Sequence, residues 1–389
     1  MKRNTTAEGV FLNLISSVLN GKTPSPLPEE ITVDEIWAIG KKQSLTAMTY
    51  TALNSISPRP DTEHWDEWRK LFYRCCVKSE IQHAEYQSVV KVLGQNNIRI
   101  IPLKGIVLQK LYPSPYMRSM SDIDLLYEGA APDQLAGLME SSGYTTMGLN
   151  SGCHDSFVKK PFTHIEMHRK LFTDEFTYQS ILSNLFESAV PDDETLGLLH
   201  MKPEDLYIHA IAHAAKHLIH GGLSVRTLCD IFLLNREYGE TWNTSYITEQ
   251  LQSVDLKTFE EKLRETAHVF LDETGSELPD LEAGLVFGKI QKTSNTQTAW
   301  RYMTSKKQSK IGYIFSVVFP PYSEMKERYP WLKKAPILLP VAWARHWRTV
   351  IRHRSWKIRT LFSVFKVSKN ELSHTEQIMN EFGLGEKNK

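Results

Sequence analysis

Residues 117–127 read Met117-Arg118-Ser119-Met120-Ser121-Asp122-Ile123-Asp124-Leu125-Leu126-Tyr127, so two acidic residues stand where a short apolar run begins. The run predicts a buried strand. Because side chains alternate along a strand, Asp122 and Asp124 would leave one face while Ile123 and Leu125 leave the other. Two carboxylates this close repel each other unless a cation lies between them, and such pairs hold two metal ions roughly 3.5–4 Å apart on a transferring phosphoryl group. Asp-x-Asp alone is more often a polar strand edge or a turn, so the surrounding sequence has to decide.

Another predicted strand and a turn precede this pair. Residues 98–103 form an apolar run typical of a buried strand, and a helix is expected from about Gly105 to Leu111. Backbone amides at the start of a helix can hold phosphate, and Lys104 adds a positive charge at the same turn. We therefore predict that Lys104 and Gly105 bind a phosphate group.

A third carboxylate lies in the segment Thr163-His164-Ile165-Glu166-Met167-His168, which alternates with period two and predicts another strand. Glu166 would then share a polar face with His164 and His168. If this strand neighbours the strand with the acidic pair, we expect Asp122, Asp124 and Glu166 to form a metal-holding triad.

The rest of the chain is predicted to be mostly helical. Helices are expected over 6–96, where Thr32-Val33-Asp34-Glu35 has the pattern of a helix start. Further predicted elements are strands near 144–149 and 156–159, a helix from Pro132 to about Gly143, and helices over 171–271. These elements predict a small α/β core in a helical chain, with divisions at 1–96, 97–170, 171–280 and 281–389.

The Leu103-Lys104-Gly105 turn, the Asp122-Ile123-Asp124 strand, the Ile165-Glu166 strand and a later H-x-x-x-H helix occur in this order between residues 97 and 235. In this order they resemble the nucleotidyltransferases of the DNA polymerase β superfamily, in particular a poorly characterised bacterial branch with L-K-G and R-x-x-x-D-I-D-L-L motifs. The resemblance implies an α+β fold, with a polymerase β-like core of mixed sheet flanked by helices and large N- and C-terminal helical regions. It also implies transfer of a nucleoside monophosphate from an NTP, with ATP the expected donor and Mg²⁺, or Mn²⁺ in its place, as the metal.

The phosphate turn departs from the superfamily pattern. The wider superfamily usually places Gly-Ser or Gly-Gly about a dozen residues before the first Asp, whereas here 16 residues separate Gly105 from Asp122. Lys104 is the candidate to bind the phosphate in place of the serine hydroxyl of the Gly-Ser pattern.

The resemblance also implies roles for individual residues. Asp122 and Asp124 would hold the nucleotide-bound Mg²⁺, and one of them together with Glu166 would hold a second ion; alternatively, Glu166 would act directly as a base. Arg118 would neutralise negative charge that develops on the phosphate. The alternative is a surface arginine in a loop with no role at the site. His164 and His168 would line the acceptor side.

A stripe of histidines follows at helical spacing. His209, His213, His217 and His220 fall within an arc of roughly 80° at 100° per residue. We predict that His213 and His217 face nucleotide or acceptor from a helical lobe. The alternatives are partly buried histidines with hydrogen-bond partners, and a zinc site, because a His pair at i and i+4 can bind zinc.

The net charge of +1 conceals an uneven distribution. Residues 331–369 hold ten Lys and Arg and no Asp or Glu, so the remainder carries −9. Residues 341–366 have the pattern of a basic amphipathic helix, which would dock on the acidic body through its aromatic stripe, or bind an anionic membrane or a phosphate-rich partner. Sequence-specific nucleic-acid binding is not expected.

Four unpatterned cysteines, no signal-peptide pattern and no long apolar run predict a cytoplasmic protein. The favoured function is nucleotidyl transfer to a hydroxyl or phosphate acceptor, with release of pyrophosphate. The acceptor is left open among a small molecule, a sugar phosphate and a peptide or protein side chain. The alternative is a catalytically silent nucleotide- or peptide-binding module of the same fold.

Overall fold

The computed structural model describes residues 4–151, 153–172, 177–220, 222–272, 277–287, 302, 309–353, 363–367 and 369–384. The chain divides into two compact units, one of residues 1–214 and 223–287 and one of residues 215–222 and 288–389. The four-part division expected from the sequence stays a prediction.

The first unit begins with four helices, α1 (Ala7–Leu19), α2 (Val33–Lys42), α3 (Thr46–Ser55) and α4 (Trp65–Gln95). The start predicted at Thr32 is confirmed. The Thr32 hydroxyl accepts a hydrogen bond from the backbone N–H of Glu35, and the Glu35 carboxylate accepts one from the backbone N–H of Thr32. This reciprocal cap satisfies amide groups that the first turn of a helix leaves unpaired.

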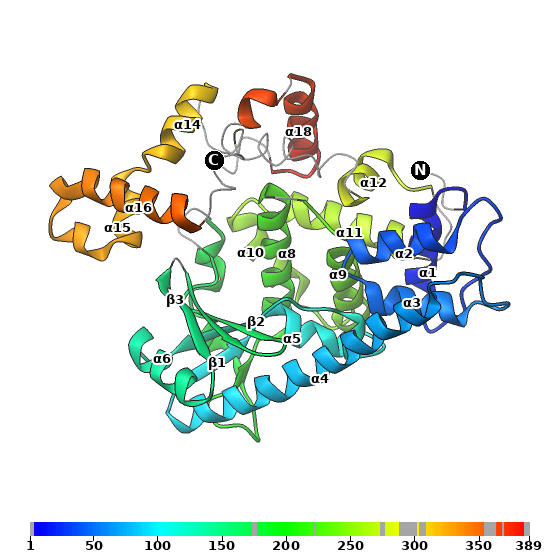
Figure 1. Cartoon of the computed structure of the whole chain (residues 1–389), viewed down its shortest axis with the longest axis horizontal. Helices are drawn as coiled ribbons and strands as arrows, with labels where there is room; N and C mark the ends of the chain where they lie inside the picture. Colours follow the sequence, from blue (N-terminus) through cyan, green and yellow to red (C-terminus); the bar gives the residue numbers. More distant parts are fainter. Residues whose placement is uncertain are drawn as a thin grey trace. The chain divides into compact units, whose positions relative to one another are not determined.

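A five-stranded mixed sheet follows (Figure 1). Its strands are β1 (Arg99–Pro102), β2 (Ile123–Glu128), β3 (Thr145–Ser151), β4 (His154–Lys159) and β5 (Thr163–His168), in the order β1-β2-β5-β4-β3. Strands β2 and β5 are parallel, and the other neighbours are antiparallel. The short helix α5 (Lys104–Leu108) follows β1, and α6 (Pro132–Ser141) follows β2. The predicted α+β class, with a mixed sheet flanked by helices, is confirmed.

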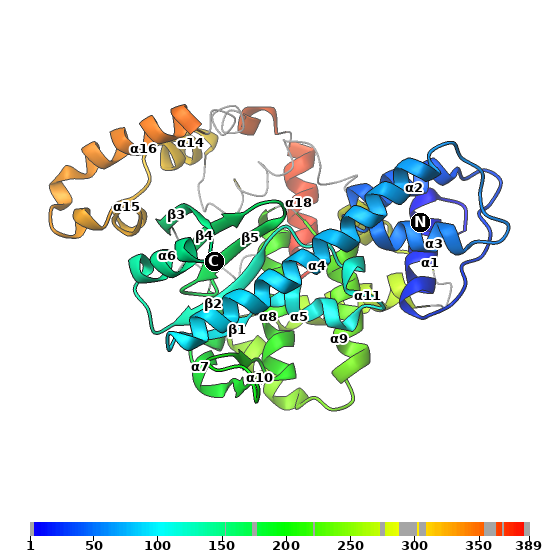
Figure 2. The ribbon, with the colours of Figure 1, turned by 60° about the horizontal axis from the view of Figure 1, so that its bottom comes forward.

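Helices α4 and α6 cover one face of this sheet. The buried cluster on that face joins Ile123 and Leu125 of β2 to Leu93 of α4 and to Leu135 and Met139 of α6. Helix α4 runs along the sheet in both ribbon views (Figure 1, Figure 2). Because strand side chains alternate, the polar residues between these apolar ones are left on the other face.

The segment after the sheet differs from the helical prediction for 171–271. It contains a two-stranded sheet, β6 (Val190–Pro191) with β7 (Leu199–His200), together with the short helices η3 (Thr177–Leu182) and α7 (Leu185–Ser188). The backbone N–H of Ile100 donates to the Gly197 carbonyl at 2.8 Å, so this segment pairs with the edge strand β1. An edge strand exposes unpaired backbone groups, and the residues just before β7 supply a partner for one of them. Regular helices then resume with α8 (Pro203–His220), α9 (Val225–Tyr238), α10 (Thr244–Ser253), α11 (Lys257–Leu271) and α12 (Asp280–Phe287).

The described part of the second unit contains α14 (Lys310–Val318), α15 (Tyr322–Arg328), α16 (Leu339–His353) and α18 (Lys369–Glu381), with short 3₁₀ turns η4 (Pro330–Lys333), η5 (Pro336–Leu338) and η6 (Ser363–Lys366). The aromatic side of α16 packs within this unit. Trp343 donates its indole N–H to the Pro320 carbonyl at 2.9 Å, and Trp347 donates to that of Val318 at 2.6 Å. Residues 354–362 of the predicted basic helix lie outside the described residues. None of the described helices combines the length and the apolarity needed to cross a membrane.

Candidate active site

The predicted acidic residues meet on the sheet face opposite α4 and α6. Asp122 directly precedes β2, and Asp124 lies within β2 in register with Glu166 of the parallel strand β5. Asp124 is only 4% exposed, and the other two carboxylates are partly buried. Ligand atoms of Asp122, His164 and Glu166 lie within 4.8 Å of one another, as do those of Asp124, Glu166 and His168. The structure therefore brings together the three carboxylates of the predicted triad and both histidines of β5.

Two cations contact Asp124. Lys104 Nζ lies 3.0 Å from Asp124 Oδ2, and His168 Nε2 lies 2.9 Å from Asp124 Oδ1. Burial alone would raise the pKa of the Asp124 carboxyl, but these contacts hold it well below its usual range. Burial alone would lower the pKa of His168, but its hydrogen bond to Asp124 helps to raise the pKa to about 10. Asp124 is therefore ionised and His168 is a cation at neutral pH.

The other two carboxylates differ in their electrostatic surroundings. The pKa of Asp122 is raised by burial and then by the charges of Asp124 and Glu166. The pKa of Glu166 is lowered, chiefly by His168, whose Nε2 lies 3.6 Å from Glu166 Oε2. Asp122 is thus the carboxylate whose negative charge is least compensated.

The donor set fits a hard divalent cation. Each of the two clusters supplies two carboxylates, whose oxygen atoms Mg²⁺ prefers, and they share Glu166. The pKa of Asp122 is raised first by burial and then by the charges of Asp124 and Glu166, and a bound cation would relieve that repulsion. Asp122, Asp124 and Glu166 are therefore the residues that could hold Mg²⁺.

The predicted phosphate turn takes a different form. The helix expected over 105–111 is split into α5 and the 3₁₀ turn η1 (Gln109–Leu111). Lys104 points its ammonium group at Asp124, as described above. Gly105 is buried, and a Cβ added there would lie 2.6 Å from Met120 Sδ. The absence of a side chain at Gly105 therefore lets the turn pack closely against the segment that enters β2.

The structure contradicts the surface-loop alternative for Arg118, whereas its predicted role in neutralising phosphate charge stays a prediction. The sequence predicted a phosphate partner or a surface arginine in a loop, but Arg118 is buried at 6% exposure. Its Nε and Nη2 each donate to the Asp230 carboxylate of α9 at 2.7 Å, and Tyr112 donates to the same carboxylate at 2.8 Å. This bidentate pair ties the segment before β2 to α9, so the guanidinium is engaged with a protein carboxylate.

The α8 histidines lie in three different environments. His209 is buried, His213 is partly buried and His217 is exposed. His209 contacts the ring of Phe172 at 5.9 Å and the ring of His213 at 6.2 Å between centroids. His217 belongs to the second unit. Among the side chains that the structure describes, the clusters able to hold a metal include none of these histidines. The cleft-lining roles of His213 and His217 stay predictions.

Two further basic residues near Asp122 were missed in the sequence. Lys78 of α4 donates to the Met120 carbonyl at 2.5 Å, and Arg226 at the start of α9 donates to the Ser119 carbonyl at 2.9 Å. Burial lowers the pKa of both groups, and the negative charge of Asp122 opposes that shift in each case. Both residues are far from Asp122 along the chain, on helices without a motif, so no local pattern marks them.

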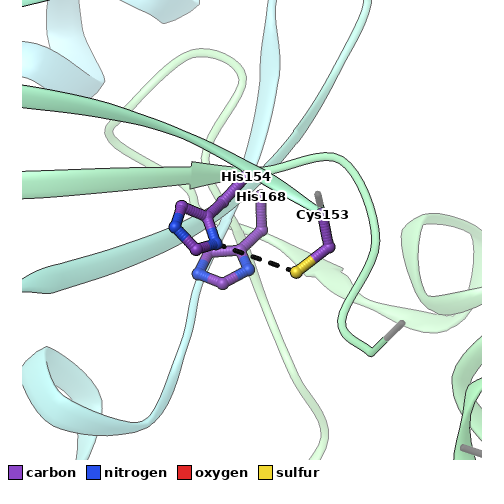
Figure 3. Close-up of side chains that lie close together, drawn as sticks. All are labelled: Cys153, His154 and His168. Carbon is purple, nitrogen blue, oxygen red and sulfur yellow. Dashed lines mark hydrogen bonds between the residues drawn. The ribbon is translucent and has the colours of Figure 1, made fainter. Parts of the chain in front are cut away.

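Cys153 and His154 were also missed. Cys153 precedes β4, and its sulfur lies 3.7 Å from His154 Nδ1 (Figure 3). Burial raises the pKa of Cys153, but the neighbouring imidazoles of His154 and His168 lower it to about 6. The Cys-His dipeptide at the start of a strand that pairs with a histidine-bearing strand was the available signal.

The family described as uncharacterised nucleotidyltransferase matches residues 29–272. This range includes the sheet, all of the acidic residues discussed above and helices α2 to α11. No match to the chain was found among curated proteins or solved structures.

Proposed function

The chain belongs to this uncharacterised nucleotidyltransferase family, and we propose that it transfers a nucleoside monophosphate from an NTP to a hydroxyl or phosphate acceptor with release of pyrophosphate. The observation that carries the proposal is the register of Asp124 with Glu166 across the parallel strands β2 and β5, with Asp122 beside them. We further propose that the sheet is a polymerase β-like core and that ATP is the donor.

Asp122, Asp124 and Glu166 would hold Mg²⁺ or Mn²⁺. The bound metal would neutralise phosphate charge and lower the pKa of the acceptor hydroxyl. The surroundings of Asp124 keep its carboxylate in the form that binds a metal. Burial of Asp124 excludes water from its carboxylate, and its lowered pKa keeps it ionised and able to bind a cation.

Lys104 would act on the nucleotide phosphates. Its ammonium group contacts Asp124 and its side chain is 23% exposed, so the flexible stem allows the charge to turn toward an incoming phosphate. Release of Lys104 from Asp124 would free a carboxylate oxygen at the same moment. Glu166 would hold the second ion or accept the acceptor's proton, and His164 beside it would line the acceptor side.

A catalytically silent binding module is the second candidate. Lys104 and His168 already compensate the charge of Asp124, so the buried carboxylate is stable without further ligands. Such a module would bind nucleotide through the same residues and form no product.

The test is incubation of the full chain with Mg²⁺ and each of the four NTPs labelled at the α-phosphate, together with fractionated cell extract. We expect release of pyrophosphate and a labelled acceptor. Asp122→Asn combined with Asp124→Asn should remove both signals, whereas Asp133→Asn, an exposed residue of α6, should leave them unchanged. Labelling by the double variant at the wild-type level would contradict the assignment. Nucleotide binding without product would favour the silent module.

A further inference from the structure

A second group of potential ligands lies beside the acidic residues and contains sulfur and nitrogen atoms. His154 of β4 is in antiparallel register with His168 of β5, and Cys153 directly precedes His154. Ligand atoms of the three residues all lie within 4.8 Å of one another. Figure 3 shows the Cys153 sulfur turned toward the two imidazole rings, whose centroids are 5.1 Å apart.

The spacing of these atoms fits a tetrahedral zinc ion. With Zn–S of about 2.3 Å and Zn–N of about 2.1 Å, a tetrahedral angle places the sulfur and nitrogen ligands about 3.6 Å apart. Cys153 Sγ and His154 Nδ1 are separated by 3.7 Å. The two ligand atoms are therefore already at the edge length of a zinc tetrahedron.

A buried nitrogen atom of His168 supports a bound metal independently of the ligand spacing. The residue is 8% exposed, and its Nδ1 is buried without a hydrogen-bond partner among the described residues. A buried polar atom without a partner costs free energy, so its presence calls for an explanation. A cation held with the Cys153 sulfur would give this nitrogen a partner.

The opposite nitrogens of both histidines face carboxylates. His168 Nε2 contacts Asp124 at 2.9 Å, and His154 Nε2 lies 3.6 Å from Glu166 Oε1. Histidines that bind zinc characteristically direct their other ring nitrogen at a carboxylate, which sets the orientation of the ring. Both rings are thus oriented as ligand histidines, with their Nδ1 atoms toward Cys153.

We propose that Cys153, His154 and His168 form a zinc site, with Cys153 Sγ, His154 Nδ1 and His168 Nδ1 as the protein ligands. Thiolate and imidazole select Zn²⁺ over Mg²⁺, which prefers the oxygen atoms of the neighbouring carboxylates. Zinc binds a thiolate and unprotonated ring nitrogens, so any proton on Cys153 Sγ, His154 Nδ1 or His168 Nδ1 leaves as the metal enters. The site stands on its own ligands and does not depend on nucleotidyl transfer.

The experiment measures metal binding by the full, metal-free chain. Zinc is titrated in competition with a chromogenic zinc indicator, and Co²⁺ is used as a spectroscopic substitute. We expect one high-affinity site and an intense tetrahedral Co²⁺ spectrum with a thiolate charge-transfer band. Cys153→Ser should remove that band and weaken zinc binding by roughly tenfold or more.

Two matched variants separate zinc binding at Cys153 from binding elsewhere on the chain. Cys76→Ser removes another partly buried thiol, on α4, and should leave zinc binding unchanged. His154→Ala should weaken binding as Cys153→Ser does, and thermal unfolding checks that each variant folds. An unchanged zinc affinity or a retained thiolate band in Cys153→Ser overturns the proposal, as does an oxygen-only Co²⁺ spectrum in the wild type.

A further pair of variants tests the carboxylate contact. Asp124→Asn should weaken zinc binding by about 10–100-fold, because Asp124 orients His168. Asp122→Asn removes a neighbouring charge of the same sign but keeps the hydrogen bond between Asp124 and His168, so it should have the smaller effect. Equal effects of the two variants would contradict the orienting role of Asp124. Because these readouts need no nucleotide, their outcome is independent of the proposed transferase activity.

Discussion

On β2, Ile123 and Leu125 pack beneath the helices that cover the sheet, whereas Asp124 between them faces Lys104 and His168. The same alternation on β5 leaves Ile165 in the apolar cluster and Glu166 among the carboxylates. Neighbouring residues of one strand thus belong to a face that stabilises the fold or to a face that gathers charge. Substitutions on the two faces should therefore separate stability from activity.

The largest expected effect is on the charged face. Glu166→Gln removes a carboxylate charge but retains the side-chain volume, so it should lower nucleotidyl transfer by roughly a thousandfold, corresponding to several kcal/mol of transition-state stabilisation. The initial rate of pyrophosphate release measures this effect. Comparable rates in Glu166→Gln and wild type would show that Glu166 is not part of the active site.

The apolar face should give the opposite result. Leu125 is fully buried in the sheet–helix cluster, and Leu125→Ala should reduce the free energy of unfolding by about 2–5 kcal/mol through lost burial and a residual cavity. Urea denaturation monitored by circular dichroism measures the change. Under conditions where this variant is still folded, we expect its initial rate of pyrophosphate release to match that of the wild type. A loss of activity without a loss of stability would contradict the division between the faces.

The two aspartates should differ in their effect on stability. Burial and the charges of its neighbours disfavour ionised Asp122, so Asp122→Asn should raise the melting temperature slightly, by the equivalent of about 1 kcal/mol or less. Asp124→Asn should lower it, because this substitution leaves Lys104 and His168 without their buried partner. Differential scanning calorimetry of the two single variants compares the shifts. If both variants shifted the melting temperature in the same direction, the neighbours would not compensate the charges of Asp122 and Asp124 to different extents.

A pH dependence of stability is expected as well. The pKa of His168 is raised from 6.5 to about 10, so the contribution of its charged form is fully present below pH 6.5. That contribution is lost as the pH rises through about 10. The melting temperature of the wild type should therefore decline across this interval more than that of His168→Gln. Parallel pH profiles for the two proteins would show that His168 does not gain its charge from the contact with Asp124.

Much of the sheet was predictable because its signals are local. The alternation at Asp122–Asp124 and around Glu166 placed all three carboxylates on polar strand faces, and the structure joins those strands as neighbours. The Thr32 cap was equally local, since both partners lie within one helical turn. The strands at 190–200 escaped prediction because they consist of two residues each and form against the edge of β1.

Partners that are distant in the chain were not predictable. The residues around Arg118 have the composition of an ordinary loop. Nothing near it in the sequence indicates that Asp230 of α9 accepts hydrogen bonds from two of its nitrogen atoms. The contact of Lys104 with Asp124 likewise requires the turn after β1 to lie beside β2.

The amino-acid sequence by itself determined which residues share a strand face, because side chains alternate with a period of two wherever a strand forms. It thereby selected Asp122, Asp124 and Glu166 as the acidic group. Only the tertiary structure decided their partners and the gathering of Cys153, His154 and His168. The physical reason is that charge compensation and ligand geometry act over a few ångströms in space, whatever the separation along the chain.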